Sequence, residues 1–154
     1  MIAATPAAPA GGTDRFTVIR VVRAAAAGSG VVQLTDAHLS NALAALIAQE
    51  VEQASGAITH VDVRNREGMR EGVTGISELG GLRLLVAVQN SPMLTTLELD
   101  GNGVQNTGAA SLIRRQLACN KIKSSADGNV DLSHSWRGLP LPLLLLMCCV
   151  SAGC

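Results

Sequence analysis

The segment Leu94–Val104, with the sequence LTTLELDGNGV, constrains the fold of this chain more than any other stretch. Leu97 and Leu99 alternate with polar residues, which predicts a short strand with one buried face. Asn102 follows the strand, where a side-chain amide can hydrogen-bond to backbone groups as the chain bends away. The segment therefore predicts a strand followed by a turn that an asparagine holds.

A helix is predicted directly after this turn, over residues 106–117. Its apolar residues recur at helical spacing on one face. They are Ala109, Leu112, Ile113 and Leu117. The strand, the turn and the helix form one unit, and such a unit needs neighbouring units to cover its apolar side chains.

Residues 94–104 resemble a leucine-rich repeat. Their apolar residues and asparagine have the spacing L-x-x-L-x-L-x-x-N-x-L, with Val104 in the last position. The pair Gly108–Ala109 is similar to the helix start in repeats of the ribonuclease-inhibitor type. The resemblance implies an α/β fold, a short solenoid with parallel strands on its concave face, helices on its convex face and disordered ends. It also implies a protein-binding scaffold.

A second, less regular unit precedes the first. Its strand residues that match the leucines are Ile58, Val61 and Val63. Arg66 stands where the turn asparagine is expected, and the apolar residues between 73 and 88 predict a helix that kinks or breaks at Gly80–Gly81. Val61 and Leu97 are 36 residues apart, more than the ~20–29 of a usual repeat, so we expect an insertion around residues 80–84.

Earlier segments carry weaker signals. Thr35 is the predicted N-cap of a helix whose apolar residues run from 39 to 54, and Gly56 is its natural stop. The stretch Phe16–Ala27 is apolar and fits a strand or a helix. Gly28–Gly30 fits a loop rather than a dinucleotide-binding turn, because the third glycine of that motif is missing.

These patterns divide the chain into five parts. They are a disordered lead at 1–14, an N-terminal segment at 15–33 whose structure the sequence does not assign, a partial leucine-rich-repeat domain at 34–120, a polar linker at 121–138 and an apolar, cysteine-containing tail at 139–154. About three repeats are normally needed to bury a solenoid core, and only two are recognisable. We therefore expect the chain to be a fragment of a longer array. The alternative is that something else covers its terminal repeat.

The composition argues against several function classes. The formal net charge is zero, so the chain lacks the basic footprint of a nucleic-acid-binding protein. One Phe, one Trp and no Tyr leave no set of aromatic platforms on which bases could stack. The four cysteines do not have the spacing of metal ligands or of a disulfide framework, which favours reduced thiols in a cytoplasmic protein. No cofactor is expected.

The apolar stretch Leu139–Val150 leaves a membrane alternative open. It is shorter than the ~20 residues that a helix needs to cross a bilayer. Small residues at 124–126, a polar spacer and the apolar tail nevertheless follow the order of a lipid-anchor signal. A membrane-tethered repeat protein is therefore a second functional hypothesis. A third is a regulator of a GTPase, a role known among proteins with this repeat.

Six side chains on the predicted concave face are candidates for contacts with a protein partner. They are His60, Asp62 and Arg64 on one strand and Thr96, Glu98 and Asp100 on the next. Strands lie about 4.8 Å apart, so Asp62 and Glu98 would be like-charged neighbours that water screens, whereas Arg64 and Asp100 would attract. We expect a mixed, mildly acidic patch that receives a basic or polar protein surface. The alternative is a solvated sheet face without a partner.

The sequence predicts neither an enzyme nor a metal site. His60 and Asp62 share one exposed strand face, and no serine or cysteine nucleophile has a spacing tied to them. Asp100–Gly103 is similar to the start of a calcium loop but lacks the spaced acidic ligands and the closing glutamate. The prediction is a non-catalytic protein–protein interaction module.

Overall fold

Helices and strands alternate along the described part of the chain. The computed structural model describes residues 13–54, 56–65 and 75–126. The elements are, in order, α1 (Arg15–Ala27), β1 (Val31–Gln33), α2 (Asn41–Gln53), β2 (His60–Asp62), α3 (Glu78–Asn90), β3 (Thr96–Glu98) and α4 (Gly108–Ala126). The fold is therefore of mixed α/β class, and the stretch at 16–27 that fitted either a strand or a helix lies in α1.

The three strands form one parallel sheet in chain order, β1-β2-β3. Val61 lies between Val32 of β1 and Leu97 of β3. The hydrogen-bond ladder continues past the strand ends, where the Val63 N–H donates to the Glu98 carbonyl at 3.0 Å. Each connection from one strand to the next contains a helix, which is the usual crossover between parallel strands.

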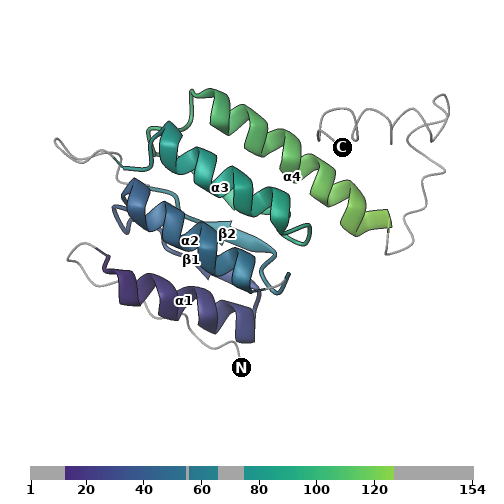
Figure 1. The fold of residues 1–154 in the computed structure, drawn as a ribbon, viewed down its shortest axis with the longest axis horizontal. Coiled ribbons are helices and arrows are strands. Elements are labelled where there is room, and N and C mark those ends of the chain that lie inside the picture. The colour runs from purple at the N-terminus through teal and green to yellow at the C-terminus, as the bar shows by residue number, and fades with distance from the viewer. Residues whose placement is uncertain (1–12, 55, 66–74, 127–154) are drawn as a thin grey trace.

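The four helices form one layer that covers one side of the sheet. α1 contacts α2, α2 contacts α3, and α3 contacts α4. Figure 1 shows these helices side by side, with the strands behind them. The core lies between the two layers, where Val32 and Val61 of the sheet are buried together with Ile47 of α2 and Val88 of α3.

The turn after β3 is held by Asn102, as the sequence predicts. The buried Asn102 amide donates to the carbonyl oxygens of Val63 at 2.9 Å and Leu99 at 3.1 Å. Its Oδ1 accepts a hydrogen bond from the Ile76 N–H at 3.3 Å. One side chain therefore ties the ends of β2 and β3 to the segment that precedes α3.

Of the two outcomes predicted at Gly80–Gly81, a kink or a break, the break is wrong, because α3 is continuous from Glu78 to Asn90. A Cβ atom on Gly80 would lie 2.6 Å from Asn41 Oδ1, and one on Gly81 would overlap Val104 Cγ2. The two glycines therefore let α3 pack closely against both neighbours. Residues 80–84 are helical rather than inserted, and the extra length of this unit lies between β2 and α3.

The start of α3 is capped from the neighbouring helix. Ser77 is the N-cap residue, but its own side chain makes no capping hydrogen bond. Asn41, the first residue of α2, accepts hydrogen bonds from the N–H groups of Ser77 at 2.9 Å and Gly80 at 3.2 Å. Asn41 thereby satisfies two of the amide groups that a helix N-terminus leaves open.

The predicted start of α2 is also wrong. Ser40, not Thr35, is the N-cap, and its hydroxyl accepts a hydrogen bond from the Leu43 N–H at 3.3 Å. Asp36 and His38 have positive φ values of 57° and 46°, which a right-handed helix does not allow. The chain after β1 therefore makes a turn before the helix begins.

The last described helix differs from its prediction in two respects. α4 runs to Ala126 and so includes the first six residues of the predicted linker. Ala109, Ile113 and Leu117 are buried, whereas Leu112 is 45% exposed. Leu112 lies about 100° around the helix from Ile113, which removes it from the face that meets the core.

Some of the predicted features lie outside the described residues. They are residues 1–12 of the predicted lead, Arg66, Val73 and the apolar tail. In the described part of the chain, none of the helices has the length and apolar character needed to span a bilayer.

Candidate functional site

The six predicted contact residues lie on β2 and β3 or directly after them. The opposed pairs in the parallel register are His60–Thr96 and Asp62–Glu98. The ladder continues beyond these strands, where the Asn65 N–H donates to the Asp100 carbonyl at 2.8 Å. This bond places Arg64 beside Asp100. The predicted pairing of the two strands is confirmed.

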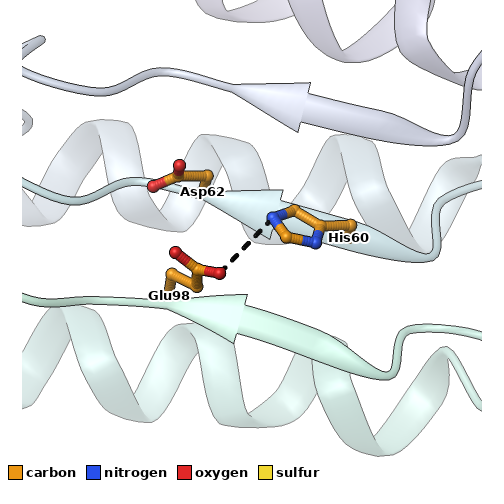
Figure 2. Close-up of side chains that lie close together, drawn as sticks. All are labelled: His60, Asp62 and Glu98. Carbon is orange, nitrogen blue, oxygen red and sulfur yellow. Dashed lines mark ion pairs between the residues drawn. The ribbon is translucent and has the colours of Figure 1, made fainter.

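These side chains project from the face of the sheet that the helices leave open. Figure 2 shows His60, Asp62 and Glu98 in front of the strands, with the helices behind. Val61, between His60 and Asp62 in the sequence, is buried in the core. Because strand side chains alternate between faces, the sheet has one apolar face under the helices and one polar face.

Arg64 binds two carboxylates at once. Its Nε donates to Asp62 Oδ1 at 2.9 Å, and its Nη2 donates to Asp62 Oδ2 at 2.6 Å. The same Nε lies 2.7 Å from Glu98 Oε2. The hydrogen bonds to Asp62, followed by the charges of Asp62, Glu98 and Asp100, raise the pKa of Arg64 above its usual range. The Arg64 guanidinium is a permanent positive charge, as arginine side chains in proteins are.

Asp62 is buried, which the sequence did not predict. We expected water to screen its repulsion from Glu98, but Asp62 is only 3% exposed. The Arg64 guanidinium, placed between the two carboxylates, offsets this repulsion instead. Asp100 adds a weaker attraction for Arg64 and accepts a hydrogen bond from Gln105 Nε2 at 2.8 Å.

His60 completes the cluster. Its Nε2 lies 3.9 Å from Glu98 Oε1, the contact that is dashed in Figure 2. His60, Asp62 and Glu98 each offer one atom that could ligate a metal ion, and these atoms lie within 4.8 Å of one another. A cation bound there would have to displace Arg64, whose guanidinium already contacts both carboxylates. The cluster therefore contains its own positive group.

Sequence reasoning missed the contribution of β1 to this face. Val31 lies beside His60 and Gln33 beside Asp62 in the parallel register. Gln33 is exposed and Val31 half-buried. The alternation of Val32 and Leu34 around Gln33 is the signal that could have placed Gln33 on this face.

The site is thus an ion cluster on the open face of a three-stranded parallel sheet. Asp62 and Arg64 satisfy each other, whereas Glu98 is partly exposed and Asp100 is exposed to solvent. Glu98 and Asp100 are therefore the carboxylates of this face that solvent reaches. Comparison of the chain with models of known protein families, with curated proteins and with solved structures finds no match.

Proposed function

We propose that this chain is a non-catalytic protein–protein interaction module, built from leucine-rich repeats of the ribonuclease-inhibitor type. The observation that supports the proposal best is the register of β2 and β3, which gathers six polar side chains on the open face of the sheet. In this reading the strands line the concave side of a solenoid and the helices its convex side. The chain is then part of a longer array, whose further repeats extend the same face.

The charge of the open face indicates the chemistry of the partner. Asp62, Glu98 and Asp100 carry three carboxylates, against one guanidinium on Arg64. Asp62 is buried, whereas Glu98, which also contacts Arg64, is partly exposed and Asp100 is exposed, so Glu98 and Asp100 are the acidic groups that a partner reaches first. We infer that the partner presents lysine or arginine side chains. A single exposed ion pair contributes only ~0–1 kcal/mol, so binding needs several such contacts.

A peptide titration of the full chain tests this proposal. The probes are a lysine-rich peptide and a glutamate-rich peptide of equal length, and the readout is the set of backbone amide shifts in an NMR spectrum. We expect the lysine-rich peptide to move the amides of His60, Thr96 and Glu98, while the glutamate-rich peptide moves none of them. The response should weaken as salt is added, because exposed charges are screened.

Two double variants separate the open face from overall charge. E98K/D100K reverses the two accessible carboxylates, and E52K/E78K makes the same change in net charge on exposed residues of α2 and α3. We expect E98K/D100K to weaken binding of the lysine-rich peptide at least about tenfold, or ~1.4 kcal/mol. The control variant E52K/E78K should change the affinity for the lysine-rich peptide little. Equal losses in both variants, or shifts confined to the helices, would contradict the proposal.

A further inference from the structure

The side of β3 that faces away from β2 is open in the described part of the chain. β3 is the last strand in the sheet order, and its central Leu97 is only partly buried. The equivalent Val32 and Val61 are 0% and 1% exposed. A groove of about 140 Å³ lies beside β3, and its apolar lining is Leu97, Leu99, Ala110 and Ile113. A further strand at this edge would cover these side chains.

The chain contains a segment with the pattern of such a strand. The centres of the three strands share an apolar–polar–apolar triplet, which is Val32-Gln33-Leu34, Val61-Asp62-Val63 and Leu97-Glu98-Leu99. Val130-Asp131-Leu132 repeats the triplet, with an acidic residue in the middle as in the last two. Successive triplets begin 29, 36 and 33 residues apart, so the fourth keeps the spacing of the others.

The end of α4 brings the chain to the correct end of the sheet. Asn120 of α4 is buried, and its Nδ2 donates to the carbonyl oxygen of Leu94, two residues before β3, at 2.9 Å. The C-terminal part of α4 therefore lies where a parallel strand would begin. In the earlier units the strand begins four to seven residues after the helix ends. Residue 129 comes three residues after Ala126, where α4 ends, so this connection would be one residue shorter than the shortest of the others.

We propose that residues 129–132 pair with β3 as a fourth parallel strand, with Val130 beside Leu97 and Asp131 beside Glu98. Val130 and Leu132 then cover the groove, as the other apolar strand residues cover the core beneath their own helices. Asp131 joins the open face and adds a carboxylate to it. The pairing of residues 129–132 with β3 does not depend on the proposed function. A role of Asp131 in partner binding would rest on the proposed function.

Disulfide trapping in the full chain tests the pairing. All four native cysteines are replaced by serine, and cysteines are then introduced as the pair E98C/D131C. Adjacent strands place Cα atoms about 4.8 Å apart, within the range that a disulfide bridges. The control pair is Q33C/D131C, because Gln33 lies on β1 and three strand spacings, about 14 Å, separate these positions.

We expect E98C/D131C to form an intramolecular disulfide at least about tenfold faster than the control pair. V130D in the same background should slow the reaction to the control rate, because a carboxylate would replace the apolar contact with Leu97. A second pair, T96C/N129C, tests the same register without altering Glu98. Equal rates for the test and control pairs, or no reaction, would overturn the proposal. A disulfide between two copies would also overturn it, by assigning the β3 edge to a second chain.

Discussion

At the residue scale, the open face is organised by Arg64. A buried carboxylate costs folding free energy unless it is paired, and Asp62 is only 3% exposed. Arg64 meets this need through two side-chain hydrogen bonds and, through the same guanidinium, also holds Glu98. Arg64, which we expected to attract Asp100, therefore binds mainly the carboxylates of Asp62 and Glu98.

Replacing Arg64 should lower the thermal stability of the protein. In R64M, the carboxylates of Asp62 and Glu98 lose their shared cation while Asp62 stays buried, so we expect a lower Tm in thermal unfolding. D62N/R64M should recover part of the loss, because it removes the unpaired charge. R83M, which changes an exposed arginine of α3, is the control. If R64M and R83M unfold at the same temperature, the guanidinium does not have the role described.

The turn asparagine makes a second residue-scale prediction. N102A removes the amide that bonds Val63, Leu99 and Ile76, and it leaves these backbone groups without that partner. We expect a loss of about 1–3 kcal/mol in the free energy of unfolding, measured by urea denaturation. N106A alters an exposed asparagine of the same loop and should change stability by less than about 0.5 kcal/mol. Similar values for the two variants would argue against this role of Asn102.

At the scale of elements, the spacing of the helices depends on the glycines of α3. Gly80 and Gly81 lie where α3 meets α2 on one side and the loop before α4 on the other. Alanine normally stabilises a helix relative to glycine. At these two positions the neighbouring atoms leave no room for a Cβ, so close packing outweighs helix propensity.

G81A should therefore destabilise the protein despite the better helix propensity of alanine. Its Cβ would overlap Val104 Cγ2 and lie 3.2 Å from the Ala109 Cβ, which forces α3 and α4 apart. We expect a loss of about 1–3 kcal/mol in the free energy of unfolding. G108A places a Cβ only 3.6 Å from Glu78 Oε1, an ordinary contact, and should be neutral or slightly stabilising. A stabilised G81A would show that the two helices are not in close contact.

The elements that could be predicted from the sequence are those with local causes. The alternation at Val61, Leu97 and Leu99 predicts the strands and their buried faces. Their pairing was expected only from the resemblance to a leucine-rich repeat. The glycine pair of α3 was misread because its cause is close contact with residues distant in the sequence. The start of α2 was misread because Asp36 and His38 have positive φ values, so the helix begins only after Ser40. The burial of Asp62 could not be predicted either, since it depends on the position of the Arg64 side chain.

At the scale of the whole molecule, the account depends on how β2 and β3 are aligned. With Val61 opposite Leu97, both apolar side chains face the helices and the charged residues share the open face. A slip of one residue would turn one strand over, so that Asp62 or Glu98 would enter the core. The ion cluster, the proposed docking face and the proposed fourth strand all require the observed register.

Backbone NMR contacts between β2 and β3 in the full chain test this register directly. We predict nuclear Overhauser effects that pair His60 with Thr96 and Asp62 with Glu98, together with a slowly exchanging Val63 N–H that donates to Glu98. Contacts displaced by one residue, or none between the two segments, would contradict the account.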